Sequence, residues 1–151
     1  MGRSLGLDVG TKTIGVAVSD AIGLLAHPVC TVARQGVRKD VVQLAAIAVD
    51  KQVDTVIVGL PLELDGTEER SARLARQIGA AMHQSTGLDV LYIDERYSSV
   101  DAERQLIQAR VGRERRKEVI DQQAAVLILQ AWLESGDGAV VDKEGANGGA
   151  E

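Results

Sequence analysis

The order of apolar and polar positions predicts strands at the start of the chain. Residues 4–9 (SLGLDV) and 13–19 (TIGVAVS) are apolar runs of strand length, and the DVGTK segment predicts a tight turn between them. Gly10 supplies the backbone freedom that this turn needs. Residues 26–34 (AHPVCTVAR) predict a third strand, and Pro28 favours a sheet edge or a strand start. Three successive strands predict an antiparallel meander.

Helical and strand patterns alternate in the rest of the chain. Residues 38–51 have apolar positions at helical spacing, whereas residues 53–60 form a continuous apolar run typical of a strand buried on both faces. Thr67 is a candidate N-cap, with Glu68 and Glu69 in the first turn that follows. The predicted elements are, in order, a helix over 38–51, a strand over 53–60, a helix over 67–85, a strand over 88–94, a helix from Ser98 or Ser99 to Ala109, and an apolar helix over 120–135.

This order of elements predicts an α/β fold with a five-stranded mixed sheet. Three antiparallel strands come first, and parallel crossovers follow, with helices flanking the sheet on both faces. Residues 1–135 are predicted to form this single domain. Residues 136–151 are Gly-rich and acidic and are predicted to be a disordered tail.

Composition narrows the possible functions and locations. The chain has 151 residues and 45% apolar residues, enough for a core without disulfides or structural metal. Cys30 is the single cysteine, which favours a reducing compartment. No signal peptide and no apolar run of about 20 residues is visible, so we expect a cytoplasmic protein without membrane attachment. The net charge of −5 argues against bulk electrostatic attraction to nucleic acid, although residues 110–117 (RVGRERRK) are basic.

Acidic residues stand at three places where polar residues meet apolar runs. Asp8 lies near the end of the predicted buried strand over residues 4–9, and it can either serve a functional site or form a turn by bonding the backbone of GTK. Asp94 and Glu95 end another strand and point to opposite faces, with an ion pair to Arg96 as the alternative to function. Asp121 stands in the first turn of the last predicted helix, where the helix dipole alone favours an acid.

Four motifs together resemble the YqgF family, also called RuvX, whose members are related to the RuvC Holliday-junction resolvases of the RNase H-like superfamily. The motifs are LGLDVGTKTIGVAVSD, VGLPLELDGTEER, YIDERYSS and DQQAAVLILQAWL, and the resemblance covers residues from about 4 to 134. It implies an RNase H-like fold and a divalent-metal-dependent nuclease. The residues that match the acidic positions of the family are Asp8, Glu95 and Asp121, which implies that they are catalytic and bind Mg²⁺ or Mn²⁺.

The chemistry of phosphodiester hydrolysis agrees with an acidic trio. Two divalent ions about 4 Å apart can position the attacking water and stabilise the leaving oxygen. Hard cations prefer oxygen ligands, which carboxylates supply. Without metal, three clustered acids repel one another, and at least one pKa should rise.

Other polar residues are candidates for contact with substrate. Lys12 can meet a phosphate or be an exposed turn lysine, and Gly66 with Thr67 can aim backbone N–H groups at an anion or form an ordinary loop. The basic segment can grip a nucleic-acid backbone through Arg113, Arg115 and Arg116, or be a solvated face. The family resemblance favours a substrate-side role for Gly59, Pro61, Asp65, Gly66, Thr67 and Arg70.

The resemblance leaves two substrates open for an endonuclease. One is precursor 16S ribosomal RNA, processed at its 5′ end during ribosome biogenesis, with pre-ribosomal particles as partners. The other is a branched DNA junction in recombination and repair. The acidic charge balance favours the RNA substrate. A resolvase needs two active sites related by twofold symmetry and hence a homodimer, but no segment of the sequence marks an interface.

Two alternatives belong to other functional classes. LDVGTKTIGVAV also resembles the first phosphate loop of the actin, sugar-kinase and heat-shock ATPase superfamily, although this chain is short for two such domains and shows no second phosphate loop. A non-catalytic protein that binds ribosomes or nucleic acid is the other alternative, which the presence of all three acids disfavours.

Overall fold

The computed structural model describes residues 2–62, 68–97 and 113–145, and it describes only the backbone of residues 97 and 113–121. No helix within these ranges is long and apolar enough to cross a membrane. The elements are β1 (Arg3–Val9), β2 (Thr13–Ser19), β3 (Ala26–Ala33), α1 (Val37–Asp50), β4 (Val53–Leu60), α2 (Arg70–Thr86), β5 (Asp89–Asp94), the 3₁₀ turn η1 (Glu95–Tyr97), α4 (Arg113–Ser135), the 3₁₀ turn η2 (Gly136–Ala139) and β6 (Val140–Glu144).

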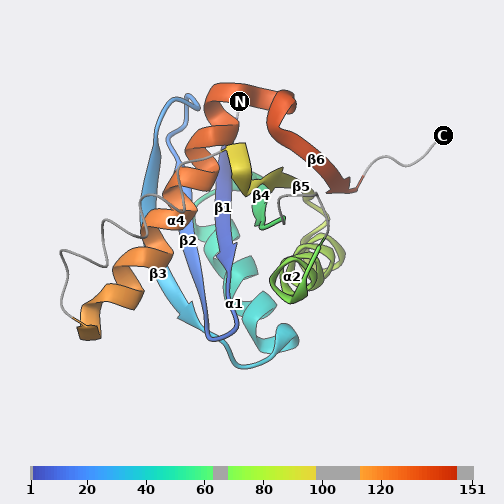
Figure 1. Cartoon of the computed structure of the whole chain (residues 1–151). Coiled ribbons are helices and arrows are strands. Elements are labelled where there is room, and N and C mark those ends of the chain that lie inside the picture. Colours follow the sequence, from blue (N-terminus) through green and yellow to red (C-terminus); the bar gives the residue numbers. More distant parts are fainter. Residues whose placement is uncertain (1, 63–67, 98–112, 146–151) are drawn as a thin grey trace.

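The described strands form one sheet in the order β3-β2-β1-β4-β5-β6. β2 pairs antiparallel with both β1 and β3, whereas β4 runs parallel to β1 and β5 parallel to β4. α4 crosses one face of the sheet, and α1 and α2 cover the other (Figure 1). The predicted α/β fold, with an antiparallel meander followed by parallel crossovers, is confirmed. The predicted number of five strands is wrong, because β6 adds to the sheet by pairing antiparallel with β5.

Alternation along β1 divides its side chains between two apolar layers. Leu5, Leu7 and Val9 belong to the layer beneath α1 and α2, so Gly6 and Asp8, which alternate with them, face α4. A Cβ atom on Gly6 would lie 2.7 Å from the Cβ of Leu129 and 3.1 Å from the carbonyl oxygen of Ala125. Because Gly6 has no side chain, α4 can lie directly against β1.

The segment after α4 is ordered by contacts with the sheet. Ala139 is buried in the layer beneath α4, and the Tyr92 hydroxyl of β5 donates a hydrogen bond to a Glu144 carboxylate oxygen at 3.0 Å. The expectation that the chain is disordered from Gly136 onwards is therefore wrong for residues 136–145. The remaining residues of the predicted tail lie outside the described part.

Two helices begin at residues other than those predicted. Glu69 occupies the N-cap position of α2, not the predicted Thr67, which lies outside the described residues. α4 begins at Arg113 and not near residue 120, because its charged residues are good helix formers that extend the helix before its apolar face starts. Asp121 therefore lies about two turns into α4, beyond the reach of the N-terminal dipole. The helix predicted from Ser98 or Ser99 to Ala109 lies outside the described residues.

Candidate active site

Three strand ends meet at one edge of the sheet, where the chain leaves β1, β4 and β5. Because these strands are parallel, their carboxyl ends lie side by side. A pocket of about 320 Å³ opens at this edge. It is lined by residues from the strand ends, the β1–β2 turn and the start of α2: Asp8, Val9, Gly10, Thr11, Pro61, Ser71 and Glu95. The structure thus brings two of the three predicted acids, Asp8 and Glu95, to one cavity.

Asp8 is a buried carboxylate near the end of a central strand. Its relative exposure is 7%, and its backbone pairs with that of Gly15 in β2. By alternation Asp8 lies on the α4 face of the sheet, whereas its neighbour Val9 packs toward α1 and α2. The turn that follows is closed by its own backbone, since the Gly10 N–H donates to the Thr13 carbonyl at 2.8 Å.

Glu95 reaches the same face from the end of β5. A Cβ atom on Gly59, at the end of β4, would lie 2.9 Å from the Oε2 atom of Glu95 and against the side chain of Ile128 in α4. The Glu95 carboxylate therefore occupies the space that a side chain at position 59 would fill. The structure gives Gly59 this packing role, and its predicted contact with substrate stays a prediction.

Asp94 has a different environment from its neighbour Glu95. It is buried, and its carboxylate accepts hydrogen bonds from the Arg96 side chain at 2.7 and 3.0 Å and from the Arg96 backbone N–H at 2.9 Å. Burial by itself raises the pKa of Asp94, but the hydrogen bonds from Arg96 outweigh burial and hold the pKa below its usual value. Of the two adjacent acids, Asp94 is the one with the predicted ion pair to Arg96, and Glu95 is the one that lines the pocket.

The direction of α4 brings the backbone of Asp121 toward the same edge of the sheet. Trp132 of α4 and Ser4 of β1 line one cavity, while Ala125 lies against Gly6, so the helix runs antiparallel to β1. One turn before Ala125, the helix reaches the level of the pocket. The Asp121 side chain lies outside the described part of the chain. No group of three potential metal ligands gathers among the described side chains, so a three-carboxylate site depends on Asp121.

The remaining predicted residues either line the pocket, are exposed elsewhere, or lie outside the described part. Pro61 lines the pocket. Lys12, beside Thr11, and Arg70, the first residue of α2, are exposed. Sequence reasoning missed Ser71, which also lines the pocket; its position in the first turn of a helix after a strand is the signal that was available. Asp65, Gly66 and Thr67, and the side chains of Arg113, Arg115 and Arg116, lie outside the described part.

Comparisons with known proteins agree with the fold and the motifs. Residues 2–135 match the model of a family described as RuvX, Holliday junction resolvase. A candidate pre-16S rRNA nuclease of Myxococcus xanthus is 49% identical over 88% of each chain. A protein of the same name from Clostridioides difficile is 48% identical over 88% of this chain and 94% of its own. The Thermus thermophilus RuvC structure in complex with a Holliday junction substrate has a TM-score of 0.59 at 12% identity, covering 92% of this chain and 99% of that one. At this identity the similarity shows the fold alone, and it confirms the RNase H-like prediction.

Proposed function

Because the chain belongs to the RuvX family, we propose that it is a divalent-metal-dependent endonuclease that hydrolyses phosphodiester bonds. One observation carries the proposal: the Asp8 and Glu95 side chains, far apart in sequence, line one pocket at the carboxyl edge of the sheet. Carboxylates that converge without a cation repel one another, and a bound cation removes that cost. Asp121 is the proposed third member of the group.

The donors in the pocket fit a hard cation. Asp8 and Glu95 offer carboxylate oxygens, and Mg²⁺ and Mn²⁺ prefer oxygen ligands in octahedral sites that retain water. The absence of a side chain on Gly59 leaves room for the Glu95 carboxylate to face the pocket. When bound, such a cation stabilises the charge that develops on the phosphate oxygens and favours the deprotonation of water.

The residues of the chain then bind and orient the substrate. Asp8 and Glu95 would hold the cation. The hydroxyl groups of Thr11 and Ser71 line its wall and can donate hydrogen bonds to phosphate oxygens. Lys12 is exposed beside Thr11 and can pair with a neighbouring phosphate of the same strand.

The proposed substrate is structured RNA, in the 5′-end processing of pre-16S rRNA within pre-ribosomal particles. The support comes from the relatives above, whose names give pre-16S rRNA as the substrate of a nuclease, and from a net charge of −5, which disfavours indiscriminate binding to nucleic acid. An enzyme with this substrate acts in the cytoplasm, the location expected from the sequence.

A branched DNA junction is the second candidate substrate. The description of the matched family names a Holliday junction resolvase, and the RuvC structure of similar fold holds a junction substrate. Two symmetric cuts in a junction require two copies of the pocket, and therefore a homodimer. The third candidate function is binding of nucleic acid without cleavage. The cleavage experiment in the next paragraph distinguishes it from the two nuclease functions.

The test compares cleavage of a pre-16S rRNA 5′ fragment and of a four-way DNA junction, each with and without Mn²⁺. We expect cleavage of the RNA only with metal, and a loss of roughly 100-fold or more in Asp8→Asn and Glu95→Gln with binding retained. Asp54→Asn is the matched control, because Asp54 is an exposed acid at the opposite end of the sheet. Wild-type rates in the Asp8 and Glu95 variants would exclude this pocket as the active site.

A further inference from the structure

An ion pair is buried behind the turn that follows Asp8. Arg34 comes directly after β3, and Asp40 lies in the first turn of α1. The Nε atom of Arg34 donates to the Oδ2 atom of Asp40 at 2.7 Å, and the Gln35 backbone N–H donates to Oδ1 at 2.8 Å. The Asp40 side chain is fully buried, and that of Arg34 is 12% exposed. Both carboxylate oxygens of Asp40 are thus engaged, and the guanidinium plane is held in one orientation.

Arg34 also holds the β1–β2 turn. Its terminal Nη1 atom donates to the Gly10 carbonyl oxygen at 2.7 Å, and its backbone N–H donates to the Lys12 carbonyl oxygen at 2.9 Å. Arg34 therefore binds the turn at both Gly10 and Lys12, on the two sides of Thr11. Gly10 follows Asp8 by two positions, and both Gly10 and Thr11 line the pocket.

The geometry requires an arginine with a fixed partner. A guanidinium group can donate to Asp40 and to Gly10 at once because its nitrogens form a rigid planar fork, whereas the three donors of a lysine ammonium share one nitrogen on a flexible stem and do not reproduce that fork. A buried ion pair is weak evidence for stability, because its desolvation offsets much of the attraction. Its more direct effect here is to fix a backbone turn beside a carboxylate, and sites for cations require carboxylates held within about 0.5 Å of their working positions.

We propose that Asp40 and Arg34 are positioning residues of the active site. Asp40 orients the guanidinium group of Arg34, and Arg34 fixes the Gly10–Lys12 turn so that the Asp8 carboxylate stays in the geometry that a divalent cation needs. This inference rests on the proposed function, since it assigns Asp8 to the cation site.

Arg34→Lys tests the proposal, with Arg38→Lys as the matched control on the exposed side of α1. The lysine retains a charge beside Asp40 but loses the link to Gly10. We expect the Kd for Mn²⁺, measured by calorimetry on the metal alone, to rise about tenfold, as for other residues that support metal ligands. Amide hydrogen exchange at Gly10 should accelerate, and kcat should fall while the KM for substrate stays within about twofold. Arg38→Lys should change none of these quantities.

The outcomes separate three cases. Wild-type Mn²⁺ affinity and wild-type Gly10 exchange in folded Arg34→Lys overturn the proposal, because the ion pair then supports only stability. If Arg34→Lys does not fold, Asp40→Asn takes its place: the amide retains an acceptor for the Gln35 N–H but no longer holds the guanidinium, and the same rise in Kd is expected. If Asp8→Asn itself leaves Mn²⁺ binding unchanged, the proposed function fails, independently of what Arg34 does.

Discussion

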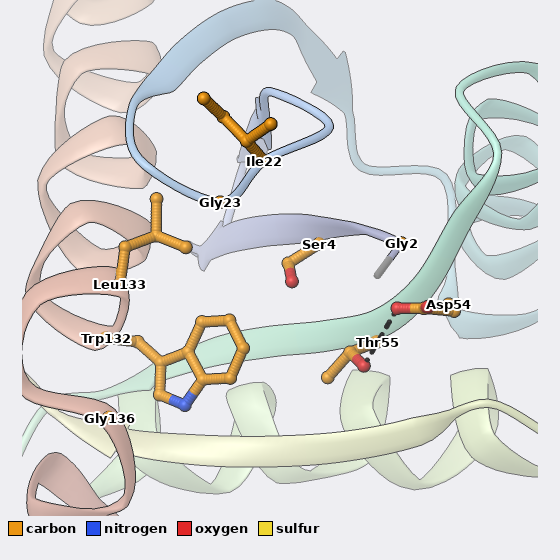
Figure 2. A pocket seen from close by; sticks show the side chains of 9 residues that line it. All are labelled: Gly2, Ser4, Ile22, Gly23, Asp54, Thr55, Trp132, Leu133 and Gly136. Atoms are coloured by element: carbon orange, nitrogen blue, oxygen red, sulfur yellow. Dashed lines mark hydrogen bonds between the residues drawn. The ribbon is translucent and has the colours of Figure 1, made fainter.

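Two pockets at opposite ends of β1 have similar volumes and different chemistry. The pocket at the carboxyl end measures about 320 Å³ and contains Asp8 and Glu95, and the pocket at the other end measures about 370 Å³. Figure 2 shows the second pocket, in which Trp132 stands opposite Ser4 and Thr55. Asp54 on its rim accepts a hydrogen bond from the Thr55 hydroxyl at 3.1 Å.

The comparison teaches that cavity size alone does not point to the proposed active site. The pocket at the beginning of β1 is the larger, but it is lined by a single carboxylate beside an indole ring and aliphatic side chains. The pocket at the end of β1 brings together acids from two strand ends that converge because the strands are parallel. The number and origin of the carboxylates therefore support the pocket at the end of β1 as the proposed active site.

A methyl group at position 59 should damage the first pocket most. In Gly59→Ala the new carbon would lie 2.9 Å from the Glu95 carboxylate and against Ile128, so either Glu95 or α4 must move. We expect Mn²⁺-dependent cleavage to fall roughly 100-fold and the free energy of unfolding to fall by about 1–3 kcal/mol. Gly138→Ala, where a Cβ meets open space near the second pocket, is the control and should keep its rate. Equal rates for the two variants would show that the position of Glu95 does not matter.

Trp132→Ala, at the second pocket, should lower the stability of the protein without changing cleavage. The variant removes the indole that packs beneath α4 and should lower the free energy of unfolding by about 2–4 kcal/mol in urea titrations. The cleavage rate per folded molecule should not change. Trp132→Phe should cost less, because the indole Nε1 is buried without a hydrogen-bond partner in the described part of the chain. A loss of cleavage per folded molecule in either variant would contradict this prediction and show that the second pocket contributes to cleavage.

The pair of Asp94 and Glu95 sharpens the comparison between an acid in an ion pair and an acid proposed to bind the cation. Since the pKa of Asp94 lies below its usual value in the folded state, its pairing stabilises the protein above the unfolded pKa of about 3.9, and this contribution is lost as pH falls through the folded pKa. Asp94→Asn should therefore be less stable than wild type at pH 7, with a difference that shrinks below about pH 4 in urea titrations. Glu95→Gln should show the converse, with lost cleavage and nearly unchanged stability.

The smallest effect is expected on β6, the outer strand that pairs with β5. In Asp142→Asn the Arg76 guanidinium loses one partner but retains the Glu68 carboxylate, to which it donates at 2.7 Å. Asp142 is half exposed, so the loss of free energy of unfolding should be about 0.5 kcal/mol or less. Cleavage should stay at the wild-type rate. A loss of more than about 1 kcal/mol in the free energy of unfolding, measured by urea titration, would contradict this prediction. It would mean that the ion pair between Arg76 and Asp142 stabilises β6 more than exposed ion pairs usually do.

The sequence was most informative where one local pattern decides the structure. β1, β2 and β4 follow from their apolar runs, and the acids at positions 8 and 95 stand out because polar residues interrupt or end such runs. The start of α4 and the strand β6 were missed for a related reason. The first is too charged to show an apolar face, and the second is a short apolar segment between Gly-rich and acidic residues that becomes a strand only by pairing with β5.

The parts of the site that depend on contacts across space could not be predicted. The place of Ser71 in the first turn of a helix can be read from the sequence, but its distance from Asp8 cannot, because that distance depends on where α2 starts relative to the end of β1. The link from Asp40 through Arg34 to Gly10 joins three separate elements by hydrogen bonds. Such links depend on tertiary geometry, which residue spacing along one chain does not encode.

The outer strands of the sheet carry a further consequence. β3 contains Pro28, which offers no backbone N–H for pairing, and β6 is five residues long and places Asp142, Lys143 and Glu144 in succession. A strand from another molecule that added to either side would lose a ladder hydrogen bond or face unfavourable charge. The sheet therefore ends on both sides in strands that discourage edge-to-edge aggregation.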